Sequence, residues 1–136
     1  MTVVVDASVA IKWLLEEEGS EAARRLAADE VMVAPELMLI ECANVLRTKT
    51  RFGQLDEALS RQALLALEAM PMRWAPIRPY VAAAHAIAIE LNRSAYDALY
   101  LALALSERAV LVTAHQRFAS AALAHPAYDR SVRLLG

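Results

Sequence analysis

The chain has few cysteines, glycines and aromatic residues, and each shortage excludes a class of protein. Its 136 residues include one cysteine, Cys42, which rules out an internal disulfide and a zinc site built from several cysteines. Only three glycines occur, so no glycine-rich loop is present to cradle the phosphates of a nucleotide. Aromatic residues make up 6% of the chain and are not interleaved with basic residues, so no base-stacking platform is visible.

Long hydrophobic runs are also lacking. The longest, Ala98 to Leu105, is far shorter than the roughly 20 apolar residues that a membrane-spanning helix needs. The N-terminus has no basic segment ahead of an apolar one, so we interpret Thr2–Val5 as a first strand and not as a signal peptide. These features predict a protein of the reducing cytoplasm that makes no use of a membrane.

The charge is close to balanced, with a formal net charge of −2 at pH 7. This argues against strong non-specific binding to duplex nucleic acid, whose affinity comes mainly from neutralised phosphates. Arg47, Lys49 and Arg51 nevertheless cluster at the end of one predicted helix. They are interpreted either as a local basic patch or as an ordinary solvated helix face.

The residues that are present favour an α/β domain. Hydrophobic residues reach 58%, above the usual roughly 45–50%, and alanine and leucine supply most of them. Strands are expected at Thr2–Val5, Val31–Val33, Met72–Ile77, Ala109–Val112 and Ser131–Leu134. Helices are expected at Ala7–Glu16, Ser20–Ala28, from after Pro35 to Arg51, Leu55–Met70, Tyr80–Leu91, Tyr96–Glu107 and Gln116–Ala124. This alternation predicts a single domain over residues 1–136 with a parallel sheet and helices on both of its faces.

Three acidic residues stand where apolar residues would be expected. Asp6 directly follows the first strand, Glu41 lies inside an apolar helix, and Asp97 opens the most apolar helix of the chain. A buried carboxylate is costly unless it is paired, hydrogen-bonded or bound to a cation. One shared metal site would explain all three, and hard oxygen ligands suit Mg²⁺ or Mn²⁺.

Structural roles compete with this interpretation for two of the acids. Asp6 is a good N-cap for the helix that follows it, although Ser8 would serve equally well and leave Asp6 free. Ser94 and Asp97 have the spacing of a capping box, in which the acid bonds back to the capping residue.

Glu41 is the strongest of the three candidates. Its helical neighbours Leu37, Met38 and Val45 are apolar, so it lies in the apolar stripe of its helix. Asn44, one turn further along, is the expected hydrogen-bond partner that orients it. The alternative is a core ion pair with an arginine.

The carboxyl ends of the strands are the expected place for a ligand. Asp6 follows the first strand, and Thr113 and His115 follow the fourth in the same way, so these residues are expected at one edge of the sheet. For His115 three roles remain open, namely a fourth group at the metal, a proton carrier, or a polar residue that starts a helix.

Four segments resemble the PIN-domain family, and within it the VapC-type toxins of bacterial toxin–antitoxin pairs. They are VVVDAS at 3–8, Pro35 with ECANVL at 41–46, SAYDALYLA at 94–102, and TAHQRF at 113–118. Their order along the chain matches the family over essentially the whole length.

The resemblance implies an α/β/α sandwich, homodimerisation, and cleavage of RNA that depends on Mg²⁺ or Mn²⁺. It also implies a VapB-type antitoxin whose tail covers the active site. Asp6, Glu41 and Asp97 match the acidic catalytic and metal-binding residues of the family, whereas His115 stands where a fourth acid is usual. We expect this change to weaken Mg²⁺ binding and to favour Mn²⁺, since imidazole is a softer ligand. The alternative is a degenerate PIN-like module that binds an antitoxin or RNA without efficient cleavage.

Overall fold

A parallel sheet of five short strands lies at the centre of the computed structural model, which describes residues 1–136. The strands are β1 (Thr2–Val5), β2 (Val31–Pro35), β3 (Arg73–Ala75), β4 (Val110–Thr113) and β5 (Val132–Leu134), in the order β3-β2-β1-β4-β5. Val4 of β1 is paired with Val33 on one side and Leu111 on the other. The valine-rich central strands are buried on both faces, as expected where helices cover a parallel sheet.

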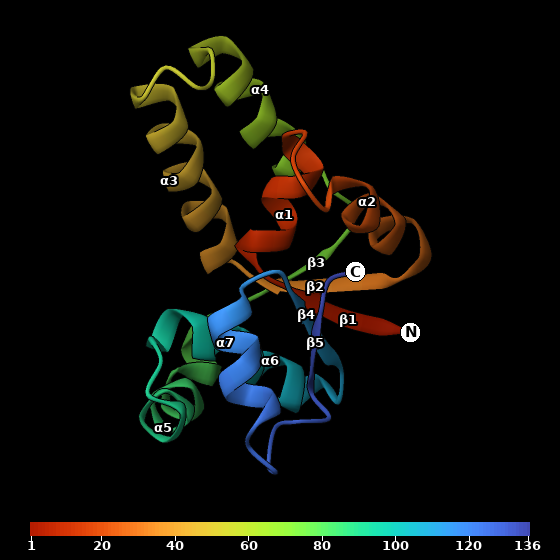
Figure 1. Ribbon diagram of the computed structural model, residues 1–136, viewed down its shortest axis with the longest axis vertical. Helices are drawn as coiled ribbons and strands as arrows, with labels where there is room; N and C mark the ends of the chain where they lie inside the picture. The colour runs from red at the N-terminus through yellow and green to blue at the C-terminus, as the bar shows by residue number, and fades with distance from the viewer.

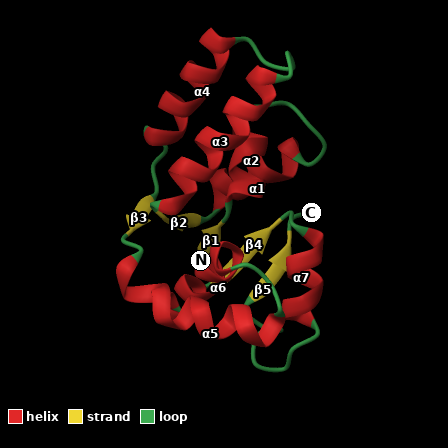
Figure 2. Cartoon of the chain, turned by 90° about the vertical axis from the view of Figure 1, so that its left-hand side faces the viewer, coloured by secondary structure: helices red, strands yellow, loops and turns green.

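Seven α-helices form the two outer layers. They are α1 (Ala7–Leu14), α2 (Ser20–Asp29), α3 (Leu37–Arg51), α4 (Glu57–Glu68), α5 (Val81–Leu91), α6 (Ala95–Glu107) and α7 (Gln116–Leu123), with a short 3₁₀ turn at Arg78–Tyr80 before α5. Figures 1 and 2 show α1 to α4 on one side of the sheet and α5 to α7 on the other. The expected three-layer α/β/α sandwich is therefore confirmed.

Helix α6 runs through the interior of the molecule. Its residues from Ala98 to Ala104 are all buried, because the helix packs against the central strands on one side and α5 on the other. This explains why the sequence is apolar around the whole helix. None of the helices is long and apolar enough to cross a membrane.

The expected elements are all present, and their ends differ by a few residues. The fourth helix begins at Glu57 and not at Leu55, because the Asp56 carboxylate caps it by accepting a 2.7 Å hydrogen bond from the Ala58 N–H. The third strand is shorter than predicted and ends at Ala75, immediately before Pro76. Thr113 is the last residue of β4 and does not follow it, since it pairs in register with Leu134.

Helices α3 and α4 rise away from the sheet as an antiparallel pair, joined at the end farthest from it (Figure 1). Helix α3 ends at Arg51, as predicted, and Gly53 follows with a φ of 72°. Glycine adopts this left-handed conformation without the penalty that other residues incur. The pair therefore links the sheet edge, where α3 begins, to a distant tip.

The strand order places a ligand crevice between β1 and β4. The chain leaves β1 toward β2 and β3 and then returns to form β4 on the opposite side of β1. In open parallel sheets, ligands bind outside the carboxyl ends of the strands at such a reversal point. Asp6 follows β1 and Thr113 ends β4, so both lie at this crevice.

Candidate active site

Asp6 is fixed at the carboxyl end of β1 by three donors. Its Oδ1 accepts hydrogen bonds from the Ser8 hydroxyl at 2.5 Å and from the Val9 N–H at 3.3 Å. Its Oδ2 accepts a hydrogen bond from the Thr113 hydroxyl. The prediction that Asp6 is free of a capping role was wrong, because Asp6 is itself the N-cap of α1. It is 8% exposed, so capping and burial hold this carboxylate in one place.

Both hydroxyls that serve Asp6 are themselves oriented by the backbone of the β4–α7 connection. The Ser8 Oγ accepts a 2.9 Å hydrogen bond from the Ala114 N–H, and the Thr113 Oγ1 accepts a 3.0 Å hydrogen bond from the His115 N–H. Because each oxygen accepts from an N–H group, its own proton is directed at Asp6. The ends of β1 and β4 are joined through this network.

Glu41 lies in the first half of α3 and is half-buried. Its Oε1 accepts a hydrogen bond from the hydroxyl of Tyr100 on α6, a residue that is itself 2% exposed. Tyr100, and not Asn44 as expected, is therefore the group that orients Glu41. The alternative of a core ion pair with an arginine is not found, since Glu41 takes part in no salt bridge.

Asp97 lies in the first turn of α6. Its N–H donates a 3.1 Å hydrogen bond to the Ser94 Oγ, so Ser94 caps the helix as the sequence spacing predicted. The Asp97 side chain instead faces His115, whose Nδ1 lies 3.6 Å from the Asp97 Oδ2. Tyr100 stands three residues beyond Asp97, so both side chains project from the same face of α6. Sequence reasoning did not identify Tyr100 as a residue of the site. Its spacing of three residues from Asp97 was the signal that could have done so.

These side chains meet around one cavity of about 170 Å³. The three acids expected from the sequence all line it, together with Ser8, Tyr100 and His115. Four elements that are far apart in the chain supply them: the start of α1, the first half of α3, the start of α6 and the start of α7. The fold therefore gathers the predicted residues at the reversal point of the sheet.

Two carboxylates of this cavity, those of Asp6 and Glu41, have a raised pKa. Burial is the main cause that raises the pKa of Asp6, and the charge of Asp97 adds to it, while the hydrogen bonds from Ser8, Thr113 and Val9 oppose the rise. Burial also raises the pKa of Glu41, the Tyr100 hydrogen bond opposes the rise, and the charges of Asp97 and Asp6 increase it. A bound cation would favour the charged carboxylates and so oppose the rise in pKa that burial and like-charge repulsion cause.

The donor set fits a hard divalent cation by its chemistry. It consists of carboxylate and hydroxyl oxygens, and the neighbouring Cys42 is no ligand because burial raises the pKa of its thiol to about 12. In the arrangement shown, however, no three His, Cys, Asp or Glu side chains come close enough together to hold a metal ion. Glu41 is turned toward Tyr100 and Asp97 toward His115.

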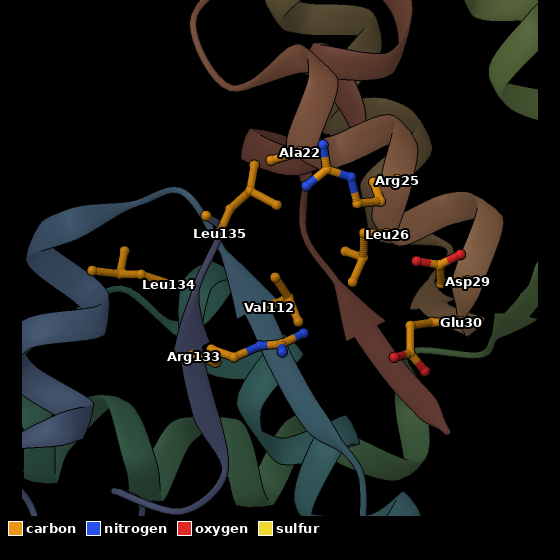
Figure 3. A pocket seen from close by; sticks show the side chains of 10 residues that line it. Ala22, Arg25, Leu26, Asp29, Glu30, Val112, Arg133, Leu134 and Leu135 are labelled. Atoms are coloured by element: carbon orange, nitrogen blue, oxygen red, sulfur yellow. The ribbon is translucent and has the colours of Figure 1, made fainter.

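A second cavity, of about 190 Å³, lies between α2, β4 and the C-terminal segment (Figure 3). Arg25 and Arg133 line it together with Asp29 and Glu30, so both signs of charge are present. None of the predicted acids borders it. The cavity at the carboxyl ends of β1 and β4 is therefore the candidate active site.

Comparison with known proteins identifies the family of this chain and other structures with its fold. The family profile described as PIN domain matches residues 3–123. Ribonuclease VapC9 of Mycobacterium tuberculosis (strain ATCC 25618 / H37Rv) is 37% identical over 116 residues, which are 85% of this chain and 87% of that protein. The fold resembles that of PAE2754 from Pyrobaculum aerophilum, with a TM-score of 0.72 and 22% identity over 89% of this chain and 79% of the other. It also resembles a toxin–antitoxin complex from Klebsiella pneumoniae, with a TM-score of 0.65 and 17% identity over 96% of this chain and 95% of the other. The chain belongs to the PIN-domain family.

Proposed function

We propose that this protein is an endoribonuclease that uses Mg²⁺ or Mn²⁺ to hydrolyse RNA phosphodiester bonds, with Asp6, Glu41 and Asp97 as its catalytic and metal-binding residues. The observation that carries the proposal is the meeting of these three carboxylates around one cavity at the reversal point of the sheet. The relative VapC9, which is 37% identical, bears the name ribonuclease and supports the substrate class.

The surrounding side chains prepare the carboxylates for this role. Ser8 and Thr113 hold both oxygens of Asp6, and Tyr100 holds Glu41 from the opposite wall of the cavity. A divalent ion bound by these residues would polarise a phosphate oxygen and lower the pKa of a bound water. Glu41, held at the cavity by Tyr100, is placed to orient or deprotonate the attacking water. His115 contributes a ring nitrogen next to Asp97, where the family has a fourth acid.

The proposed biological role is that of the toxin in a type II toxin–antitoxin pair. One of the solved structures with this fold is described as a toxin–antitoxin complex, which supports a VapB-type antitoxin as the partner. We expect the protein to act in the cytoplasm as a homodimer. Light scattering of the purified protein, with and without the antitoxin, measures both assemblies.

The deciding experiment uses antitoxin-free protein and a panel of structured RNAs in Mg²⁺, Mn²⁺ or EDTA. We expect cleavage with either metal, no cleavage in EDTA, and no cleavage by Asp97→Asn. Asp129→Asn is the matched control, since Asp129 is exposed and lies outside the cavity. Absence of cleavage by folded wild-type protein in both metals would overturn the proposed activity.

A catalytically degenerate module that binds an antitoxin or RNA is the second candidate. It is favoured by His115 at the position of the fourth acid and by the absence of three ligands already close enough to hold an ion. The two candidates differ in one result, because the degenerate module binds its partner with normal affinity and leaves every RNA uncut. If the protein is the degenerate module, we expect cleavage to appear in the variant His115→Asp.

A further inference from the structure

One face of α3 is exposed from Ile40 to the end of the helix at Arg51. Ile40, Asn44, Arg47 and Arg51 are exposed, whereas their neighbours on α3 are buried or half-buried. Their spacing of four, three and four residues places them in a single stripe. The stripe changes character along the helix, from apolar and amide side chains near the cavity to arginines at the tip.

The first end of the stripe opens directly onto the candidate active site. A groove of about 390 Å³ borders Ile40, Asn44 and Tyr96. It shares Ala7 and Glu41 with the carboxylate cavity, so the two spaces adjoin at these residues. Ile40 is 65% exposed and Tyr96 is 64% exposed, so both are accessible to a ligand that enters the groove.

The other end of the stripe forms a polar cleft between α3 and α4, which we call the arginine cleft. It has a volume of about 410 Å³ and no hydrophobic lining residue. Its lining residues are Arg47, Thr50, Arg51, Glu57, Ser60 and Arg61. Arg61 is paired with Glu57 at 2.7 Å, whereas Arg47 and Arg51 make no salt bridge. Two guanidinium groups of the cleft therefore have no ion-pair partner.

Helix electrostatics explain only part of this charge. Arg51 lies in the last turn of α3, where a cation stabilises the helix dipole. Arg47 lies one turn earlier, outside the range of that effect. Arg61 is the fifth residue of α4, also outside that range, and its i,i+4 ion pair with Glu57 accounts for its position. Positive charge is thus concentrated at this tip in a protein whose net charge is −2. The structure gives a reason for only part of that charge.

We propose that the arginine cleft binds a backbone phosphate of the RNA substrate and that the exposed stripe of α3 guides the strand from there into the active site. This inference rests on the proposed ribonuclease function. Arginine guanidinium groups bind phosphate through paired hydrogen bonds. A protein partner would favour aromatic or aliphatic anchor sites, which the cleft lacks.

The length of α3 sets the distance between the two ends of the track. Glu41 and Arg51 are ten residues apart on one helix, a rise of about 15 Å. That is the length of about four stacked nucleotides at roughly 3.4 Å each. The arginine cleft is therefore an anchor for phosphates a few nucleotides from the bond that is cut, and RNAs shorter than about four nucleotides should not depend on it.

The test compares the double variant Arg47→Gln/Arg51→Gln with the control Arg24→Gln/Arg25→Gln, which removes the same charge from the exposed face of α2. Binding of a fluorescein-labelled single-stranded RNA of about 12 nucleotides is measured by anisotropy in EDTA, between about 50 and 200 mM salt. We expect the cleft variant to bind at least about tenfold more weakly at the lowest salt, because two charge-assisted contacts are lost. Its salt slope should fall by about 0.7 for each phosphate contact removed. The control should stay within about twofold of wild type.

The outcomes separate this inference from the proposed activity. A cleft variant that cuts long RNA with a raised KM and an unchanged kcat, and cuts RNAs of about three nucleotides as wild type does, supports the inference. If wild type cuts RNA and the cleft variant keeps the wild-type affinity and salt slope, the inference is overturned and the ribonuclease function stands. If the variant loses antitoxin binding and keeps RNA binding, the cleft is a protein interface and the inference is likewise overturned. If wild type cuts nothing but the variant loses RNA affinity, the inference holds and the proposed activity falls.

Discussion

The hydroxyl of Thr113 offers the sharpest test of how the fold supports the candidate site. Thr113 is completely buried, and its hydroxyl donates to the Asp6 carboxylate while accepting a 3.0 Å hydrogen bond from the His115 N–H. Replacing it with valine keeps the shape of the side chain and removes only the hydroxyl. Thr113→Val therefore leaves a buried carboxylate and a backbone N–H each without one partner.

The expected loss of stability follows from these two hydrogen bonds. A bond to a charged group contributes roughly 1.5–3 kcal/mol, and the neutral bond about 0.5–1.5 kcal/mol. Asp6 and Thr113 are both buried, so solvent does not reduce these values substantially. Together they predict a loss of about 2–4 kcal/mol, which lowers Tm by about 8–16 °C in a domain of this size.

The measurement is thermal unfolding followed by circular dichroism at neutral pH in EDTA. Thr113→Ser is the control, since serine keeps the hydroxyl and loses one buried methyl group worth about 1 kcal/mol. If the valine variant unfolds within about 2 °C of wild type, or if serine costs as much as valine, the hydroxyl does not support Asp6 as described. Thr113→Val should also reduce RNA cleavage, because Asp6 loses one of its three positioning donors.

Three further predictions concern the same cavity. Burial raises the pKa of Asp6 above 3.8, so the contribution of Asp6 to stability is present below that pH and is lost as the pH rises through the folded-state pKa. The Tm of wild type relative to that of Asp6→Asn in EDTA should therefore fall from pH 4 to 7, and a difference that stays constant would contradict this. Tyr100→Phe removes the hydrogen bond that opposes the raised pKa of Glu41, so the acidic limb of the pH–rate profile should move to higher pH and activity on that limb should drop by up to roughly tenfold, the equivalent of one hydrogen bond. An unmoved limb would mean that Glu41 does not titrate in the reaction. His115→Asp places a carboxylate next to Asp97, so the Tm of the variant in EDTA should be lower than that of wild type. Added Mg²⁺ should raise the Tm of the variant more than that of wild type. Equal rises would show that position 115 is outside the metal shell.

The general fold could be predicted because its signals are local. Three consecutive valines in β1 and the continuous apolar run in α6 each report burial on all sides, and both are buried in the structure. Strands that alternate with helices require a parallel sheet, and parallel strands bring their carboxyl ends to one edge. From those two rules alone, Asp6 and the residues after the fourth strand were expected at the same edge.

The partners of the carboxylates could not be predicted in the same way. The Thr113–Asp6 bond joins residues 107 positions apart, and the Tyr100–Glu41 bond joins residues 59 positions apart. A local pattern offers only near neighbours, which is why Asn44 was the expected partner of Glu41. Sequence reasoning treated capping and a place in the site as alternatives for Asp6, whereas the carboxylate that caps α1 also lines the cavity.

The two ends of α3 differ in charge, so phosphate should bind at each end under different conditions. At the first end, Glu41 lines the same cavity as Asp6 and Asp97, and their charges raise the pKa of Glu41, so added negative charge is unfavourable there. A phosphate would meet that repulsion unless a cation intervened. At the other end, Arg47 and Arg51 attract phosphate without any cation. RNA binding at the arginine cleft should therefore persist in EDTA, while engagement of the scissile bond should require the metal. If both proposals hold, a strand held first by the arginine cleft would enter the acidic cavity only with a divalent ion bound there.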